Sequence, residues 1–165
     1  MRQISHVVGL DLSLSCTGMC IIPLDWGGDI LECRFDSVMT RPSMSILDRC
    51  SVIAEYISGA VTNLTAPHIG AESLRGSYSQ AKLGILHGYV ACTMSAYPYD
   101  HDVPISTARK LFLGRSMPAV KKAKQLIFEH MTSIPGVTDL NADEVDAFVI
   151  ANYMASQLGA VAWQI

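Results

Sequence analysis

The chain has 165 residues, of which half are hydrophobic and only 16% are charged, and its formal net charge is -3 at pH 7. This length suffices for one domain with a sizeable core and is short for two, so we expect a single domain over residues 1–165. The composition excludes a disordered chain, and the slightly acidic balance excludes a protein that binds nucleic acid through its overall charge. Any DNA-binding surface must therefore come from a local basic patch.

The cysteines and the N-terminus bear on the cellular compartment. The five cysteines are odd in number and lack CxxC spacing: Cys16, Cys20, Cys33, Cys50 and Cys92. We interpret them as reduced core thiols in a reducing compartment. The N-terminal MRQISHVVG lacks the apolar region of a signal peptide, and no run approaches the length of a membrane span. We expect a cytoplasmic protein with no membrane partner.

The N-terminal part of the chain predicts three strands. Residues 5–14 are apolar on both sides of Asp11, which is typical of a central strand covered on both faces. A polar connection leads to a second strand over 19–25, and a turn at 26–29 leads to a third over 30–38. Three strands in succession predict an antiparallel meander.

The rest of the chain alternates helices with short strands. In order, we expect a helix over 45–64 opened by Ser43 or Ser45, a strand over 68–73, a helix over 77–96, a strand over 102–106, a helix over 107–114 capped by Ser106 and stopped by Gly114, and a helix over 118–131. Gly84 and Gly88 lie four apart and allow close helix contact, either within the chain or with another subunit. The order β-β-β-α-β-α-β-α-α indicates an α/β fold.

The final predicted helix begins at Asn141, a good N-cap, and carries acids in its first turns. Asp143 and Asp146 are three residues apart, so both carboxylates project from one face. The positions that follow are apolar on nearly all sides, which indicates a buried helix. Carboxylates entering an apolar core require a cation or donor. The alternative is a first turn that reaches water, with its acids as partners of the helix dipole.

Other acids recur at the ends of predicted elements and favour the metal interpretation. Asp11 lies on the first strand and Glu72 near the end of the fourth, so the two converge if those strands are neighbours. Asp143 and Asp146 can reach the same place from the last helix. Clustered carboxylates repel one another unless cations lie between them, and hard oxygen ligands favour Mg²⁺ or Mn²⁺. Two such ions can support phosphodiester cleavage. The five histidines lack metal-ligand spacing.

Three segments, in this order, resemble the RuvC family of Holliday junction resolvases: the strand with GLDLS, the strand HIGAES and the helix with DEVDA. The resemblance covers almost the whole chain, and Asp11, Glu72, Asp143 and Asp146 match the four acids of the family. It implies a ribonuclease-H-like α/β fold, with a five-stranded mixed sheet whose first three strands are antiparallel, flanked by helices. It also implies a homodimer and two Mg²⁺ ions per site, replaceable by Mn²⁺. The small size would suit a bacteriophage member, acting in an infected host as others act in the bacterial cytoplasm.

The loop after the second acid departs from the family, which usually carries there a bulky residue that enters the junction. Here the loop reads LRGSY, so Leu74, Arg75 or Tyr78 is the candidate. Tyr78 is preferred for stacking on a base, and an equal alternative is that it covers the start of the next helix. STARKLFLG resembles the basic stretch of the family and places Arg109 where the family often carries Lys. Lys121 falls about one residue from a second family lysine.

Basic residues concentrate between Glu72 and the acidic helix, where eight of the twelve Lys and Arg residues fall. Phosphate contacts supply most nonspecific affinity for DNA. A solvated helix face is the alternative for the lysines of the 118–131 helix. We expect a DNA-binding surface made by Arg75, Tyr78, Lys82, Arg109, Lys110, Arg115, Lys121, Lys122 and Lys124.

The predicted function is a metal-dependent, structure-specific endodeoxyribonuclease that resolves four-way and other branched DNA by paired phosphodiester hydrolysis. One alternative is an RNA-processing nuclease of the same superfamily, and another is a junction-binding scaffold that does not cleave. A third arises because GLDLSLSCTG resembles the phosphate loop of sugar kinases. Those kinases need a second domain, for which 165 residues leave no room.

Overall fold

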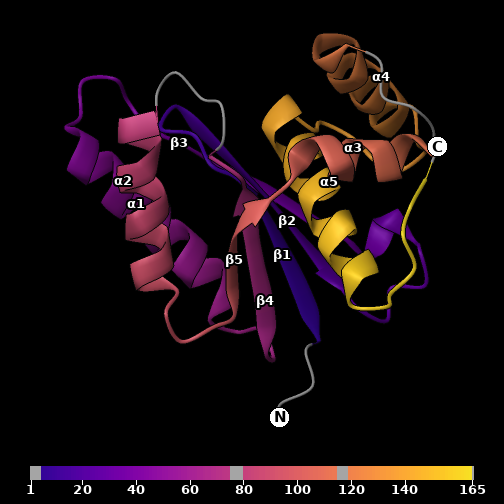
Figure 1. Ribbon diagram of the computed structural model, residues 1–165, viewed down its shortest axis with the longest axis horizontal. Coiled ribbons are helices and arrows are strands. Elements are labelled where there is room, and N and C mark those ends of the chain that lie inside the picture. Colours follow the sequence, from indigo (N-terminus) through magenta and orange to yellow (C-terminus); the bar gives the residue numbers. More distant parts are fainter. Residues whose placement is uncertain (1–4, 75–79, 115–118, 165) are drawn as a thin grey trace.

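The computed structural model describes residues 5–74, 80–114 and 119–164. Five strands form one sheet in the order β3-β2-β1-β4-β5, with helices on both faces (Figure 1). In chain order the elements are β1 (His6–Asp11), β2 (Cys16–Pro23), the 3-10 helix η1 (Ile30–Glu32), β3 (Arg34–Met39), α1 (Ile46–Val61), β4 (Pro67–Glu72), α2 (Gln80–Thr93), β5 (Tyr99–Val103), α3 (Ile105–Leu113), α4 (Val120–Thr132) and α5 (Ala142–Gln157). The expected order of strands and helices is confirmed.

The sheet is mixed, as predicted. Strands β1, β2 and β3 form an antiparallel meander. Strand β4 returns parallel to β1, and β5 is parallel to β4. The predicted neighbourhood of the first and fourth strands is thereby confirmed, and it places the carboxyl ends of β1 and β4 at the same edge of the sheet.

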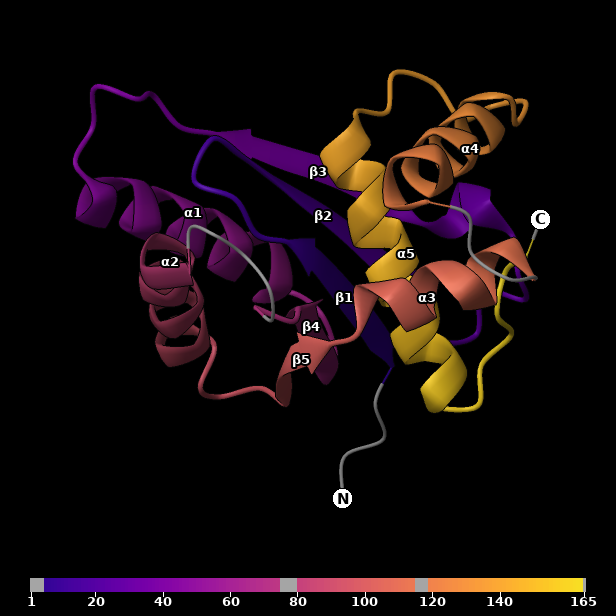
Figure 2. The ribbon, with the colours of Figure 1, turned by 45° about the horizontal axis from the view of Figure 1, so that its top comes forward.

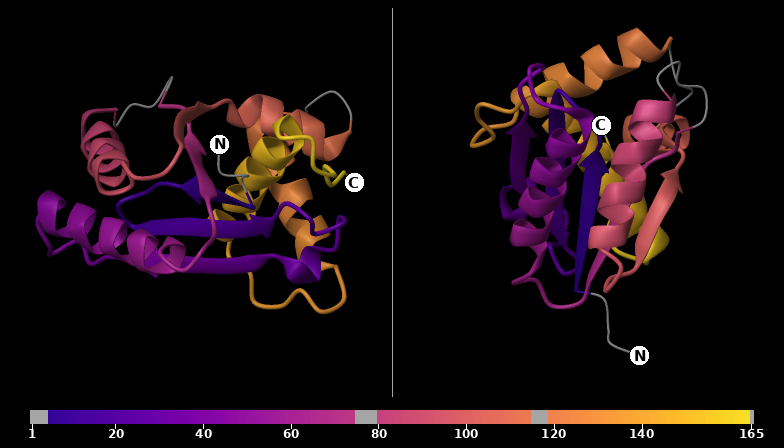
Figure 3. Two further views of the ribbon diagram at one scale, coloured as in Figure 1. Left: turned by 90° about the horizontal axis from the view of Figure 1, so that it is seen from below. Right: turned by 90° about the vertical axis from the view of Figure 1, so that its left-hand side faces the viewer.

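Alternating residues of β1 divide the interior into two cores. Val8 and Leu10 pack with residues of α1 and α2, whereas Val7 belongs to the core beneath α5. In Figure 1, α1 and α2 lie on one side of the sheet and α3, α4 and α5 on the other; Figure 3 shows the same layers from two further directions. Side chains alternate between the faces of a strand, so Gly9 and Asp11 share the α5 face with Val7.

Helix α5 lies against the sheet more closely than side chains would allow. A Cβ on Gly9 would stand 2.2 Å from the carbonyl oxygen of Ala147 and 2.6 Å from the backbone nitrogen of Ala151. A Cβ on Gly18 would stand 2.1 Å from the carbonyl oxygen of Asp143. Both neighbours are backbone atoms that cannot turn aside. Glycine is therefore required at both positions for α5 to reach its place.

Hydrogen bonds fix both ends of α5. Asn141 and Glu144 form a capping box, in which each side chain accepts a hydrogen bond from the other residue's backbone N–H. The Asn141 side chain also donates to Ser37 Oγ at 3.0 Å, which ties the helix start to β3. Near the other end, Asn152 exchanges two hydrogen bonds with the backbone of Trp163. The N-cap predicted at Asn141 is confirmed.

The predicted bounds of the first three strands need correction. Strand β1 ends at Asp11, so this acid stands at a strand end and not in mid-strand. Residues Cys16 to Gly18, expected in a connection, begin β2. The predicted third strand starts instead with η1, because the Asp29 side chain accepts a hydrogen bond from the backbone of Leu31 and caps a helical turn. Leu31 is consequently 59% exposed and does not alternate into the core.

Two later predictions also need correction. Strand β5 spans Tyr99–Val103 and not 102–106, because Pro104 has no N–H to continue the ladder. Pro104 is also the N-cap of α3, so the cap expected at Ser106 is wrong. The caps expected at Ser45 and Gly114 are confirmed.

The helix starts expected at residues 77 and 118 lie outside the described residues, and α2 and α4 are described from Gln80 and Val120. Of the five cysteines, Cys20 and Cys50 are buried and Cys92 is exposed, so Cys92 is not the core thiol that we expected. No helix in the described part of the chain has both the length and the apolar character to cross a membrane.

The predicted crossing at Gly84 and Gly88 is not made within the described chain. A Cβ on either residue would meet nothing within 4 Å among the described residues. The other alternative, contact with another subunit, stays a prediction.

The close approach of α5 predicts that Gly9→Ala destabilises the protein. The added methyl group must push the helix from the sheet, and overpacking of this kind lowers the free energy of unfolding by about 1–3 kcal/mol. Gly59→Ala is the matched control, because Gly59 lies in α1 with nothing within 4 Å of an added Cβ. It should raise the free energy of unfolding by about 0.5–1 kcal/mol. Urea denaturation of the two variants checks the pair, and equal effects would contradict the close approach.

Candidate active site

The first two acids, Asp11 and Glu72, lie at the ends of two parallel strands. Leu10 of β1 pairs with Ala71 of β4, and Asp11 and Glu72 are the next residues in this register. Each is the last residue of its strand. Asp11 lies on the face covered by α5, and Glu72 follows Gly70 onto the same face. The two strands therefore end side by side at the edge of the sheet where α5 begins (Figure 1).

The third acid is positioned through a glycine. Gly18 of β2 pairs with Asp11 across the antiparallel ladder, and its Cα lies against the backbone of Asp143 in the first turn of α5. A larger residue at this position would separate the helix start from Asp11. The close packing of α5 on the sheet thus sets the distance between Asp143 and the two acids at the strand ends.

The fourth acid is buried between two cations. The Asp146 side chain is 7% exposed, and its Oδ1 accepts a hydrogen bond at 2.9 Å from Nη2 of Arg109 in α3, which is 3% exposed. Its Oδ2 accepts one at 2.5 Å from Nζ of Lys124 in α4, whose side chain is 50% exposed. Figure 2 shows α3 and α4 beside α5. These helices therefore supply positive charge to the acidic end of α5.

The electrostatics show that the four acids act on one another. Burial, together with the charges of Asp146 and Glu72, raises the pKa of Asp11 to about 7, although the charge of Lys124 opposes the rise. Asp143 contributes in the same direction as the other acids. Burial also raises the pKa of Glu72, where Asp146 adds to the effect and Arg109 and Lys124 oppose it. Asp11 and Glu72 thus lie at neighbouring strand ends, as predicted, and the metal-binding role of the four acids stays a prediction.

The donor set suits a hard divalent cation, although the side chains are not arranged around one. Four carboxylates in one partly buried place are the ligands that Mg²⁺ and Mn²⁺ prefer. Within residues 5–74, 80–114 and 119–164, however, no three His, Cys, Asp or Glu side chains are grouped closely enough to hold a metal ion. At Asp146, each carboxylate oxygen accepts a hydrogen bond from a cationic side chain.

Apart from Lys124, which contacts Asp146, the residues expected to bind DNA fall into three groups. Lys82, Lys110, Lys121 and Lys122 are exposed, as a phosphate contact requires. Arg109 is buried against Asp146, so its predicted place on a DNA-facing surface needs correction. Arg75, Tyr78 and Arg115 lie outside the described residues.

Sequence reasoning missed two features of the site. Cys16 lies beside Asp143, and burial together with a hydrogen bond to that carboxylate raises the pKa of the thiol to about 12. Its place at the start of β2, two residues before Gly18, is the signal that could have located it. Lys124 was expected to contact DNA but contacts an acid of the site. Nothing in the local sequence pattern distinguishes it from Lys121 and Lys122.

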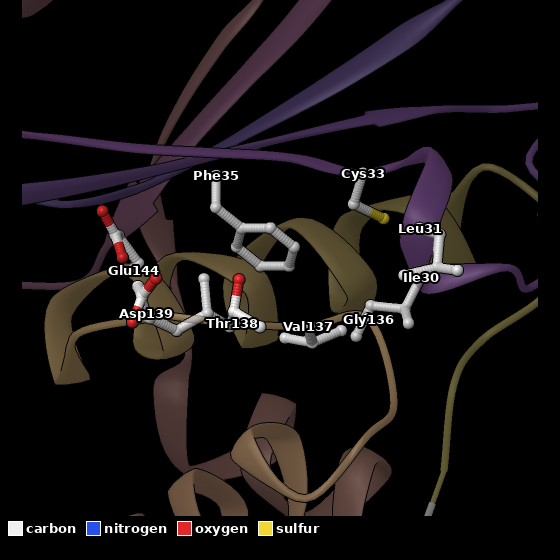
Figure 4. Close-up of a pocket in the computed structure, with 10 residues that line it drawn as sticks. Ile30, Leu31, Cys33, Phe35, Gly136, Val137, Thr138, Asp139 and Glu144 are labelled. Carbon is white, nitrogen blue, oxygen red and sulfur yellow. The ribbon is translucent and has the colours of Figure 1, made fainter.

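A pocket of about 280 Å³ lies elsewhere on the molecule, between η1 with β3 and the loop that precedes α5 (Figure 4). Ile30, Phe35 and Val137 are among the residues that line it, with Asp139 and Glu144 at one end. None of the four acids, Asp11, Glu72, Asp143 and Asp146, lines it. The pocket is therefore not the site of the acid chemistry.

The sequence matches no family model and no curated protein. Solved structures do match. A structure of Thermus thermophilus RuvC aligns with 94% of this chain and 97% of its own, at 17% identity and a TM-score of 0.65. Another, of T. thermophilus RuvC in complex with a Holliday junction substrate, aligns with 94% of this chain and 96% of its own, at 14% identity and the same TM-score.

The fold of this chain is that of RuvC. The ribonuclease-H-like α/β architecture predicted from the sequence is thus confirmed, together with the resemblance that implied it. The two alignments span nearly the whole length of both proteins. The elements that carry Asp11, Glu72, Asp143 and Asp146 all belong to the described architecture.

The raised pKa of Asp11 predicts a stability that falls with pH in the metal-free protein. Above about pH 4 the unfolded chain releases this proton, while the folded protein keeps it up to about pH 7. The unfolded state therefore binds fewer protons between these values, and the free energy of unfolding decreases as pH rises through them. Asp11→Asn should remove this loss and be more stable than the parent at pH 8 by roughly 2–4 kcal/mol. Urea denaturation in EDTA at pH 5 and pH 8 checks this, and equal pH dependence of both proteins would contradict it.

Proposed function

We propose that this chain is a metal-dependent endonuclease that cleaves branched DNA, with four-way junctions as its main substrate. The observation that carries the proposal is the convergence of four carboxylates at one end of a sheet with the RuvC fold. The similar structure of T. thermophilus RuvC in complex with a Holliday junction substrate supports the choice of DNA. Residues 1–165 would act as one nuclease domain in the cytoplasm.

Asp11, Glu72, Asp143 and Asp146 would hold Mg²⁺ or Mn²⁺, two ions to a site. Divalent ions, when bound, supply an activated water and neutralise charge on the leaving oxygen. The chain itself supplies the rigid placement of the ligands. Asp11 and Glu72 are fixed at strand ends, and the other two acids are fixed by the seat of α5. Such placement is what catalysis by positioned charges requires.

The exposed lysines would hold the DNA backbone. Lys110, Lys121 and Lys122 are exposed on α3 and α4, the helices that flank the acidic end of α5. Lysine contacts with phosphates provide affinity that falls with salt and does not depend on sequence. Arg75, Tyr78 and Arg115 remain candidates for further contacts. Tyr78 is the preferred candidate for stacking inside the junction.

A homodimer would place two sites on opposing strands, and α2 is the candidate interface. Its outward face is apolar, with Ile85 44% exposed and Tyr89 39% exposed beside the unfilled surface of Gly84 and Gly88. Large apolar side chains gathered on one face of a helix, next to glycines that permit close approach, are typical of helix pairing between subunits.

A second candidate function has an observation of its own in favour. Both oxygens of Asp146 are engaged by cations, which is the arrangement expected of a protein that binds junctions without cleaving them. Tight junction binding with no cleavage in either Mg²⁺ or Mn²⁺ would favour this scaffold.

Removal of a ligand acid should separate binding from cleavage. Asp11→Asn and Glu72→Gln each remove a metal ligand, and loss of several kcal/mol of metal assistance predicts a fall in cleavage rate of about a thousandfold or more. Junction affinity should be retained, because these acids do not bind phosphate. A labelled four-way junction in Mg²⁺, Mn²⁺ or EDTA, with linear duplex of the same sequence as the control substrate, measures both quantities. Full cleavage by either variant would refute the site.

The apolar face of α2 predicts that Ile85→Glu yields a monomer. A buried unpaired charge at the centre of an interface prevents association. Light scattering after gel filtration checks the mass, and the junction assay should show single nicks in place of paired ones. Leu47→Glu is the matched control, since Leu47 is 61% exposed on α1 and outside the proposed interface. Dimers of the Ile85 variant, or a monomeric parent, would exclude this interface.

A further inference from the structure

The two cations on Asp146 differ in how firmly they are held. Arg109 is 3% exposed and its guanidinium lies inside the protein between α3 and α5. Lys124 reaches Asp146 from the surface of α4, and half of its side chain remains exposed. The Arg109 contact belongs to the core. The Lys124 contact can open without uncovering buried surface.

The chemistry of the two side chains matches this difference. Arginine presents a planar, weakly hydrated group that suits buried ion pairs, whereas lysine carries a compact, strongly hydrated ammonium on a flexible stem. An ammonium that leaves Asp146 regains water readily. Buried Arg109 has no comparable route, and its departure would leave an uncompensated charge in the interior.

Lys124 also acts on more than one acid. Its charge acts on Asp11 and Glu72 as well as on Asp146, which it contacts directly. The half-exposed ammonium of Lys124 thus lies among the acids, where a positive charge is stabilising. A divalent ion bound by the same acids would compete with it for Asp146 Oδ2.

We propose that Lys124 is an exchangeable internal counter-ion of the acid cluster, displaced from Asp146 when a divalent metal binds, while Arg109 stays in place and fixes the other carboxylate oxygen. The inference rests on the proposed metal-dependent function. It makes Lys124 a positioning residue that sets metal affinity, and it leaves Asp146 one oxygen, Oδ2, for a metal.

The test is the metal affinity of Lys124→Met, which keeps the length of the side chain and removes its charge. Without the competing ammonium, Mn²⁺ should bind roughly tenfold more tightly, a change equivalent to about 1.4 kcal/mol. Calorimetric titration of the metal-stripped protein with Mn²⁺ alone, at pH 8 and low salt, gives the dissociation constant. Lys124→Arg, which keeps the charge, should bind Mn²⁺ no more tightly than the parent.

Lys122→Met is the matched control. It removes the same charge from the same helix, at an exposed residue with no ion pair to an acid among the described residues. Its effect on Mn²⁺ affinity should be less than about twofold, because exposed charges are screened. Equal gains in the two Met variants would show a general charge effect and would overturn the exchange.

Thermal unfolding gives a second readout that needs no activity. In EDTA, Lys124→Met should have a lower Tm than the parent, because the carboxylates have lost a counter-ion. Saturating Mg²⁺ should raise its Tm by more than it raises that of the parent. An equal rise in both proteins would overturn the exchange.

The outcomes also separate this inference from the proposed function. If the parent binds Mn²⁺ and Asp11→Asn abolishes that binding, the metal site stands, and an unchanged affinity in Lys124→Met defeats the exchange alone. If neither the parent nor Lys124→Met binds Mn²⁺, both ideas fail. Binding by Lys124→Met and none by the parent would support the exchange in its strongest form.

Discussion

The structure depends on how closely α5 can approach the middle of the sheet. The backbone of the helix touches β1 at Gly9 and β2 at Gly18, where no side chain fits. Because Gly18 also pairs with Asp11, this one contact fixes the distance from the strand-end acid to the start of the helix. The two acids of α5 therefore reach the strand ends through the same packing that builds the core. The close packing of α5 on the sheet therefore determines both the fold and the positions of the acids.

That constraint has an electrostatic consequence. A helix seated so closely carries Asp146 into the interior, where an unpaired carboxylate is costly. Arg109 and Lys124 form ion pairs with this carboxylate and offset the cost. Burial and the neighbouring acids still disfavour a charge on Asp11 and raise its pKa to about 7. Groups with strongly perturbed pKa values cluster at functional sites, since structure alone gives no reason to gather like charges. Arg109 and Lys124 reduce the repulsion among the four carboxylates in the folded protein. They do not neutralise all four, so a further cation would still be stabilising.

Much of the fold and of the candidate site can be predicted from the sequence, because the patterns that indicate them involve residues close together in the chain. The run of apolar residues before Asp11 and the N-cap at Asn141 are short-range patterns, and each marks the end of an element. The parallel return of β4 beside β1 follows from connection rules, and it brings Glu72 to Asp11. The pairing of Arg109 with Asp146 spans 37 residues and has no periodic signal, so a buried arginine was taken for a surface one. Likewise, the single hydrogen bond from Leu31 to Asp29 changed a predicted strand start into a helical turn.

The packing of α5 builds both the core and the site. Substitutions of the four acids must therefore be interpreted with their effect on stability in mind. Asp11 and Glu72 end their strands and have no cation bonded to them among the described residues, so their neutral analogues remove charge from a repulsive cluster. Asp146 differs, because its replacement leaves Arg109 buried without a partner, and such a loss destabilises by about 3–5 kcal/mol. Lost cleavage in an Asp146 variant would therefore mix catalysis with folding. Lost cleavage in a variant of a strand-end acid cannot be ascribed to lost stability, because the packing that positions these acids lies in the glycines beneath α5 and not in their own side chains.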